Sequence, residues 1–351
     1  MKANQSLSVP RLVRVKSGAI NRIGIYLARE GLERVAVFKS EGLPTDITTK
    51  LYRGLASESI DVVSDAEVAS GSFENAIDLF HSLPPGTQAL LGIGGGKAID
   101  VAKYAAFLAG LPFYAAPTSL SNDGFASPQS SLTVRERRRS LASRMPSAVI
   151  VDIAVCQTAP TVLWHSGVGD LVAKLTAVAD WKLAYHHDRT PVNDFAALLS
   201  DATVMQFLAN PVRNEEGLKT FAMALLLNGV SMEIAGTSRP ASGSEHLISH
   251  ALDGILSPPR LHGLQVGLAS YVVAHLQRNT FVPRIAELFD RTGFWESAKA
   301  YPISLADFLA AVERAPTIKS NFHTILDQTD APREVERLVS RDSRLRDCLI
   351  G

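Results

Sequence analysis

The chain has little cysteine: only Cys156 and Cys348 occur among its 351 residues. Two cysteines this far apart match neither a disulfide framework nor a Cys-x-x-Cys metal motif. We therefore expect a protein of a reduced, cytoplasmic compartment.

Net charge is also missing, because 35 basic and 35 acidic residues cancel. A balanced chain has no long-range field that would favour nucleic acid or an anionic membrane. The N-terminal stretch lacks the continuous apolar segment of a signal peptide, and the longest apolar runs are too short or too interrupted to cross a bilayer. Fixed-period repeats and low-complexity segments are absent as well. We expect no nucleic-acid partner and no membrane insertion.

Hydrophobic residues, in contrast, make up 46% of the chain. This is enough to form the cores of two domains in a chain of this length. In residues 1–157, short apolar runs such as 34–40, 89–94 and 111–119 alternate with helical patterns, which indicates a parallel sheet of βαβ units. In residues 158–351, alanine- and leucine-rich segments with helical spacing dominate. The sequence predicts a Rossmann-like α/β domain followed by an all-α domain.

A glycine loop joins one predicted strand to the next helix, which we expect to begin near Lys97. Gly94, Gly95 and Gly96 stand at this junction, where a helix N-terminus offers free N–H groups to an anion. The loop has neither the Walker A spacing nor the G-x-G-x-x-G spacing of dinucleotide-binding folds. It is either a phosphate-binding loop or a tight turn.

A second polar loop, Pro117–Ser127, follows the next predicted strand. Its hydroxyl groups and Asp123 lie at the carboxyl end of a parallel strand, where open α/β sheets bind ligands. An Asx-rich turn would have the same composition.

Three histidines fall within a short stretch of the second domain. His246 and His250 share one face of a predicted helix that Ser242 or Ser244 would cap, and His262 belongs to another element. Asp170 opens a predicted helix of the same domain. Imidazoles and a carboxylate can form a three-ligand catalytic metal site, but histidines also serve as structural residues, and the spacing does not select the ligands.

Four stretches together resemble the sn-glycerol-1-phosphate dehydrogenases of the dehydroquinate synthase-like superfamily, which includes the iron-containing alcohol dehydrogenases. They are GIGGGKAIDVAKY, APTSLSNDGFASP, SGVGDLVAKLTAVADWKLA and SRPASGSEHLISHALD. The resemblance implies a dehydroquinate synthase-like fold and a metal held by Asp170, His246 and His262. Asp170, His250 and Asp123 are its implied catalytic residues, with His250 and Asp123 beside the substrate.

The resemblance also implies a cofactor, NAD or NADP, and a divalent metal, Zn²⁺ with Ni²⁺ or Fe²⁺ as alternatives. The chain is expected to assemble as a homo-oligomer. The implied cofactor contacts are Gly94, Gly95, Gly96, Lys97, Ala98, Ile99, Asp100, Thr118, Ser119, Leu120, Ser121 and Ser127.

The implied reaction interconverts a polyol phosphate and its ketone, above all sn-glycerol 1-phosphate and glycerone phosphate. A metal polarises the oxygen, hydride passes to or from nicotinamide, and His250 or water carries the proton. The alternatives are a dehydroquinate-synthase-like cyclase acting on a sugar phosphate and a dehydrogenase for another polyol or alcohol. Two cationic groups are candidates for the substrate phosphate: Arg239 and the run Arg135–Arg139, which also fits a solvated surface.

Overall fold

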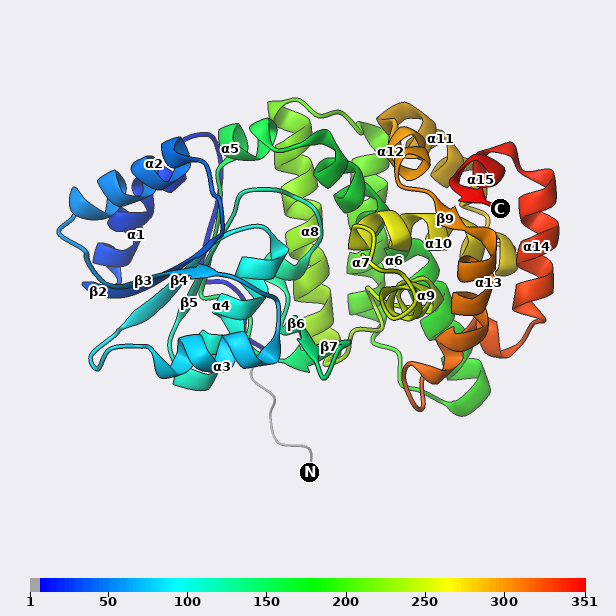
Figure 1. The fold of residues 1–351 in the computed structure, drawn as a ribbon, viewed down its shortest axis with the longest axis horizontal. Helices are drawn as coiled ribbons and strands as arrows, with labels where there is room; N and C mark the ends of the chain where they lie inside the picture. Colours follow the sequence, from blue (N-terminus) through cyan, green and yellow to red (C-terminus); the bar gives the residue numbers. More distant parts are fainter. Residues whose placement is uncertain (1–6) are drawn as a thin grey trace. The chain divides into compact units, whose positions relative to one another are not determined.

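The structure, a computed structural model, describes residues 7–351 and divides into two compact units (Figure 1). The first contains the chain up to Ala159 together with Arg213–Glu233. The second contains Pro160–Val212 and Ile234–Gly351. The segment Arg213–Glu233 thus groups with the N-terminal unit, although its sequence texture resembles the helical half of the chain.

The first unit is built on a six-stranded sheet whose strands all run parallel. The strand order is β1-β8-β5-β4-β2-β3. Chain order reverses between β2 and β4, so the loops that follow these two strands lie at the position where open α/β sheets bind ligands. The parallel sheet predicted from the sequence is confirmed. The strands are β1 Leu12–Val15, β2 Arg34–Ser40, β3 Asp61–Val68, β4 Ala89–Gly94, β5 Phe113–Pro117 and β8 Ala148–Val151.

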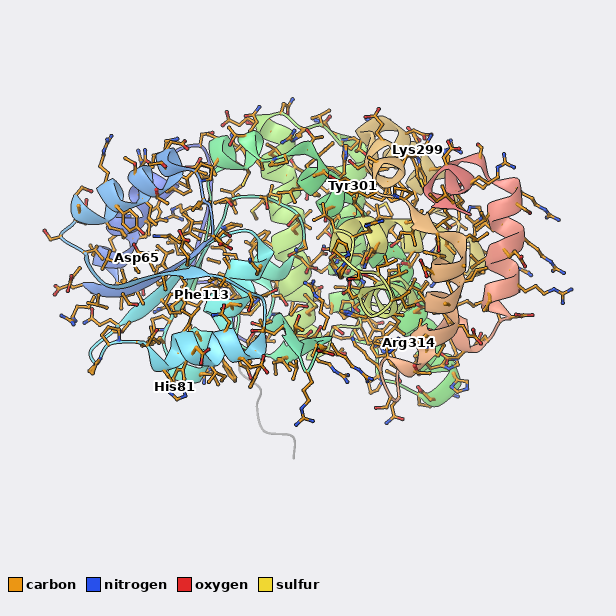
Figure 2. All side chains as sticks on the ribbon, viewed as in Figure 1. Asp65, His81, Phe113, Lys299, Tyr301 and Arg314 are labelled. Atoms are coloured by element: carbon orange, nitrogen blue, oxygen red, sulfur yellow. The ribbon has the colours of Figure 1, made fainter. Side chains whose placement is uncertain are left out.

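Helices cover both faces of this sheet. In Figure 1, α1 (Ile23–Arg29) and α2 (Thr45–Ala56) lie on one face, and α3 (Phe73–His81) and α4 (Gly96–Ala109) lie on the other. Strands β4, β5 and β8 are buried along their whole length, as expected of central parallel strands. The edge strand β3 is more exposed, and its Asp65, which is labelled in Figure 2, accepts hydrogen bonds from Lys39 and Tyr52.

The first unit also contains α5 (Ile153–Thr158), an antiparallel hairpin of β6 (Gln129–Val134) and β7 (Arg137–Ala142), and α8 (Glu215–Ala235) up to Glu233. Helix α8 is longer and more apolar than the apolar runs of the sequence predicted. Its 21 residues and hydropathy of 1.3 reach the range of a bilayer span, but 56% of the apolar window is buried inside the protein. This burial is typical of a core helix.

The second unit is helical apart from two strands of two residues each, β9 (Ile303–Ser304) and β10 (Leu349–Ile350). Its longest helix, α6, has 28 residues. Lys299 of α12, which is labelled in Figure 2, pairs with Asp347 of α15 at 2.7 Å. The helices are α6 Thr161–Asp188, α7 Asp194–Ala209, α9 Ser244–Asp253, α10 His262–Leu276, α11 Val282–Thr292, α12 Phe294–Ala300, α13 Leu305–Arg314, α14 Ala331–Arg341 and α15 Ser343–Cys348.

Helices α6 and α10 cross at glycines. A Cβ atom on Gly169 would collide with the backbone of Gly263 and Gly267, and one on Gly263 would collide with the carbonyl of Ser166. Only glycine permits so close an approach of two helix backbones. The crossing brings the residue after Gly169, which is Asp170, close to the start of α10.

Candidate active site

Asp170, His246 and His262 come together in the second unit. Each offers one ligand atom, and these atoms lie within 4.8 Å of one another. The Nε2 atoms of His246 and His262 are 3.5 Å and 3.9 Å from Asp170 Oδ1. Helices α6, α9 and α10 supply one residue each, so three separate elements hold the cluster.

Local structure differs from the sequence prediction at two points. Asp170 does not open a helix, because α6 begins at Thr161 and continues through the glycines that precede Asp170. No serine side chain caps α9. Instead, Asp180 of α6 accepts hydrogen bonds from the backbone N–H and the hydroxyl of Ser244, at 2.8 and 2.6 Å.

The outer nitrogen of each imidazole in the cluster has its own hydrogen bond. His246 Nδ1 donates to Glu245 Oε1 at 2.9 Å, and His262 Nδ1 lies 3.2 Å from Ser249 Oγ. Such bonds fix the ring orientation and the tautomer of metal-binding histidines. Glu245 and Ser249 were not among the residues predicted from the sequence, although Glu245 directly precedes His246. The Nε2 atoms are thereby left to face Asp170.

Lys174 balances the charge of Asp170 from one helical turn away. Its Nζ lies 3.4 Å from Asp170 Oδ2, and both side chains are almost fully buried. Burial alone would raise the pKa of Asp170, but the charge of Lys174 and the hydrogen bond from His246 outweigh it and hold this pKa below its usual range. Asp170 is therefore a carboxylate at neutral pH, which is the form that binds metal.

His250 lies beside this cluster but outside it. The described residues whose ligand atoms converge are Asp170, His246 and His262, and His250 is not among them. It follows His246 on α9, with its ring 6.1 Å from that of His262 and its Nδ1 3.9 Å from Asp253 Oδ2. Two other histidines of this unit have partners of their own: His165 binds Ser297 and Thr292, and His187 stacks on His323.

The glycine loop of the first unit connects β4 to α4, whose first residue is Gly96. Gly94 has φ +140°, and a Cβ atom there would collide with Ser40 Oγ, which also accepts the N–H of Gly95. Ser40 ends β2, so the loops after β2 and β4 meet at the chain reversal of the sheet. The first N–H groups of α4 have no partner within the helix and are available to an anion.

The predicted cofactor residues that follow the glycines differ in the burial and the partners of their side chains. Those of Ala98 and Ile99 are buried, so a ligand can reach these residues only through the backbone. Asp100 is 6% exposed and pairs with Lys103 at 3.1 Å. Lys97 extends to the carbonyl of Ala69.

The polar loop after β5 lies against this glycine loop. Thr118 donates its N–H to the carbonyl of Gly94 at 3.0 Å, and Asn122 Nδ2 lies 3.0 Å from the position that a Cβ atom on Gly96 would take. Ser119, Leu120 and Ser127 are buried, whereas Ser121 and Asp123 are partly exposed. The structure thus places the two predicted cofactor loops side by side.

Lys103, which was not predicted from the sequence, holds these loops together. Its buried Nζ binds Asp100 and also donates to the carbonyl of Gly124 at 2.6 Å, next to Asp123. Burial lowers the pKa of Lys103, and Asp100 opposes that change. Its position one helical turn after Asp100 was the available signal.

We expect Lys103→Met to lower the free energy of unfolding by about 3 to 5 kcal/mol, because Asp100 would keep a buried charge without its cation. Urea unfolding measures this loss. The double variant Lys103→Met/Asp100→Asn should recover part of it. A single variant as stable as the parent protein would contradict this role of the pair.

The chain is similar to several known proteins. A family model for iron-containing alcohol dehydrogenase matches residues 14–160. The glycerol-1-phosphate dehydrogenase [NAD(P)+] of Thermococcus sibiricus is 40% identical over 249 residues, which cover 70% of this chain and 71% of the relative. The enzyme of the same name from Aeropyrum pernix is 34% identical over 95% of this chain and 97% of its own length.

The fold is shared with more distant proteins. The crystal structure of glycerol dehydrogenase from Schizosaccharomyces pombe superimposes with a TM-score of 0.77 at 19% identity, covering 98% of this chain and 92% of that one. At this identity the likeness concerns the fold, whereas the relatives at 34–40% identity show the family. The chain belongs to the glycerol-1-phosphate dehydrogenase family, within the iron-containing alcohol dehydrogenases.

Proposed function

We propose that this protein is a metal-dependent, NAD(P)-linked dehydrogenase that interconverts sn-glycerol 1-phosphate and glycerone phosphate. The observation that carries the proposal is the cluster of Asp170, His246 and His262 in a chain whose relatives of similar length are named glycerol-1-phosphate dehydrogenases. The name of these relatives indicates the substrate, and the cluster offers a binding site for the metal that the reaction needs.

The residues present fit a divalent metal ion. Two imidazoles and one carboxylate form the donor set of a three-ligand catalytic site, which leaves room for a substrate oxygen. Glu245 and Ser249 hold the two rings from outside, as expected around metal ligands. We take Zn²⁺ as the first candidate, with Ni²⁺ and Fe²⁺ as alternatives, since imidazole and carboxylate ligands suit all three.

When bound, the metal would polarise the oxygen on carbon 2 of the substrate as a Lewis acid, and the nicotinamide would exchange hydride with that carbon. The protein's own residues have the remaining tasks. Lys174 keeps Asp170 ionised, and Glu245 and Ser249 fix the rings of His246 and His262. His250 would carry the proton of the substrate hydroxyl, and Asp123 would bind another substrate hydroxyl.

Residues of the first unit would bind NAD or NADP. The backbone at Gly94–Asp100 and the first turn of α4 would hold the pyrophosphate. Thr118, Ser119, Leu120, Ser121 and Ser127, on the adjacent loop, would line the nicotinamide side. The contact between the two loops at Thr118 and Gly94 supports this assignment.

We expect Gly95→Val to raise the dissociation constant for NADH or NADPH by about tenfold or more, the equivalent of one lost charge-assisted hydrogen bond. Gly95 has φ −77°, which suits any residue, and no described residue lies within 4 Å of its Cβ position. A side chain there would therefore fill space intended for the cofactor while the unfolding free energy changes by less than about 0.5 kcal/mol. Fluorescence titration with the reduced cofactor measures the affinity.

Gly94→Ala is the matched control. Its Cβ atom would meet Ser40 in a left-handed backbone region, so this variant should lose stability as well as cofactor affinity. Unchanged cofactor affinity in Gly95→Val would move the cofactor away from this loop.

A cyclase related to dehydroquinate synthase would use the same fold, metal and cofactor. The names of the relatives favour the dehydrogenase. Product analysis of the metal-loaded protein separates the two activities. A dehydrogenase consumes one NADH or NADPH for each glycerone phosphate reduced and releases no phosphate. Phosphate release from a sugar phosphate without net change in NADH would establish the cyclase instead.

We also expect the protein to act in the cytoplasm as a homo-oligomer. Both cysteines are free and buried, which suits a reduced compartment. Phe195 and Leu198 on α7 are 63% and 66% exposed, and this apolar surface is available to a second copy. Light scattering at several protein concentrations tests the oligomeric state.

A further inference from the structure

Two cations lie over one aromatic ring in the second unit. The guanidinium of Arg239 is 3.6 Å from the centroid of the Phe322 ring, and Lys319 Nζ is 4.6 Å from the same centroid. Arg239 belongs to the turn before α9, and Lys319 follows η3 (Ala315–Thr317). A cation–π contact stabilises each group, but it does not neutralise the charge.

Neither cation has a counter-ion in contact within the described part of the chain, residues 7–351. Arg239 is 3% exposed; its Nη1 donates to the carbonyl of His323, and its Nη2 has no hydrogen-bond partner among residues 7–351. Lys319 Nζ donates to Ser238 Oγ at 3.3 Å. Buried charges are ordinarily paired with an opposite charge, so this arrangement is costly without one.

The pKa values of both groups reflect this cost. Burial lowers the pKa of Arg239. Burial, together with the positive charge of Arg239, lowers the pKa of Lys319 to about 8. A bound anion would reverse both effects, because it stabilises the charged form of each side chain.

The surrounding carboxylates are engaged with other groups. Asp180, Asp188 and Asp327 attract Arg239 from beyond ion-pair distance. Asp180 accepts hydrogen bonds from Ser244, Asp188 from Thr190, and Asp327 from Thr324. The two cations therefore remain available to a ligand that carries negative charge.

Two interactions connect this pair to residues around the metal-binding cluster. Glu245 attracts Lys319 electrostatically, and the same side chain accepts the hydrogen bond from His246. The buried turn that carries Arg239 leads directly into α9, and Lys174, which pairs with Asp170, donates to the carbonyl of Ala241 in that turn. Lys319 is partly exposed, so the pair is not sealed from solvent.

We propose that Arg239 and Lys319 bind the phosphate of the substrate. The proposal rests on the function proposed above, since it names the residues that would select a phosphorylated substrate at that site. A guanidinium and an ammonium supply the donors that phosphate oxygens prefer, and the hydroxyl of Ser238 lies beside them. The exposed run Arg135–Arg139 belongs to the β6–β7 hairpin of the other unit and has no such enclosure.

Kinetics with and without the phosphate group test the assignment. Lys319→Met should raise KM for glycerone phosphate by about 10- to 100-fold, the effect of losing a charged hydrogen bond. Turnover of unphosphorylated glycerone should stay within about twofold, because that substrate makes no contact with the pair. Arg239→Lys, which keeps the charge but loses the planar fork, should give a smaller increase in KM than Arg239→Gln.

Lys182→Met is the charge-matched control, since Lys182 is an exposed cation on α6 of the same unit. This variant should leave KM unchanged for both glycerone phosphate and glycerone. If Lys319 and Arg239 had a purely structural role, their substitution would instead lower the stability of the protein and reduce turnover of both substrates equally. Equal losses with glycerone phosphate and glycerone would overturn the proposal.

A binding measurement that does not depend on catalysis separates this proposal from the function itself. Inorganic phosphate should bind the full-length protein in calorimetry, and Lys319→Met should weaken that binding about tenfold or more while Lys182→Met leaves it unchanged. Phosphate binding that is lost in Lys319→Met would support the anion site even if glycerone phosphate were not reduced. Phosphate binding that is undiminished in Lys319→Met and Arg239→Gln would overturn it.

Discussion

His262→Ala should lose its bound metal and nearly all turnover while the fold persists. The variant removes one of three ligand atoms that lie within 4.8 Å of one another, and Asp170 and His246 alone form a weak site. Loss of Lewis-acid stabilisation amounts to several kcal/mol, so turnover should fall by at least about 10³-fold. Metal content by mass spectrometry and turnover of NADH measure the two effects, and circular dichroism checks the fold.

His81→Ala is a suitable control because His81 is an exposed imidazole at the end of α3. It should keep the metal content and turnover of the parent protein. If His262→Ala retained full activity and the parent protein bound no metal, the assignment of Asp170, His246 and His262 would be wrong.

His250→Ala should have the opposite combination of effects: near-stoichiometric metal and cofactor, but turnover reduced about 10²- to 10⁴-fold. This is the range for loss of a positioned proton-transfer group. His250 lies on α9 after His246, and its ring is 6.1 Å from that of His262, yet its nitrogens do not join the converging ligand atoms. A fourth protein ligand would also close the position that the substrate oxygen needs.

The comparison with His246→Ala decides between a proton carrier and a ligand. Both residues are on one helix, so effects on folding should be similar. Metal loss in His250→Ala equal to that in His246→Ala would make His250 a ligand, and the proton carrier would have to be another residue.

The sequence was most informative where chemistry depends on local spacing. His246 and His250 lie on one helix, and the triple glycine joins a strand to a helix, as expected from helical periodicity and from glycine's backbone freedom. Asp170 was placed in the correct unit but at the wrong point of its helix. Glycines before it resembled a loop, whereas the structure uses Gly169 to let α6 approach α10.

Contacts between distant segments could not be predicted. Lys319 becomes a partner of Arg239 only because both pack on Phe322, and no periodicity links these positions. Two other contacts also join distant segments: Ser249 lies beside His262, and Asp180 of α6 accepts a hydrogen bond from Ser244 at the start of α9. Lys174 and Glu245, in contrast, stand one helical turn and one residue from predicted ligands, so inspection of those neighbours would have found them.

The grouping of α8 with the first unit also depends on tertiary packing. Its sequence is alanine- and leucine-rich like the helices of the second unit, and composition alone does not distinguish them. A Cβ atom on Gly229 would collide with the backbone of Ala126, which shows how closely α8 packs against the loop after β5. That contact is visible only in three dimensions.

The most direct test of the account follows the oxidation of NADH and NADPH by the full-length protein with glycerone phosphate, before and after removal of metal by a chelator. We expect turnover with at least one cofactor, its loss on chelation, and its recovery when Zn²⁺, Ni²⁺ or Fe²⁺ is added back, with sn-glycerol 1-phosphate as the product. Undiminished turnover in the metal-free protein, or no oxidation of either cofactor by the metal-loaded protein, would contradict it.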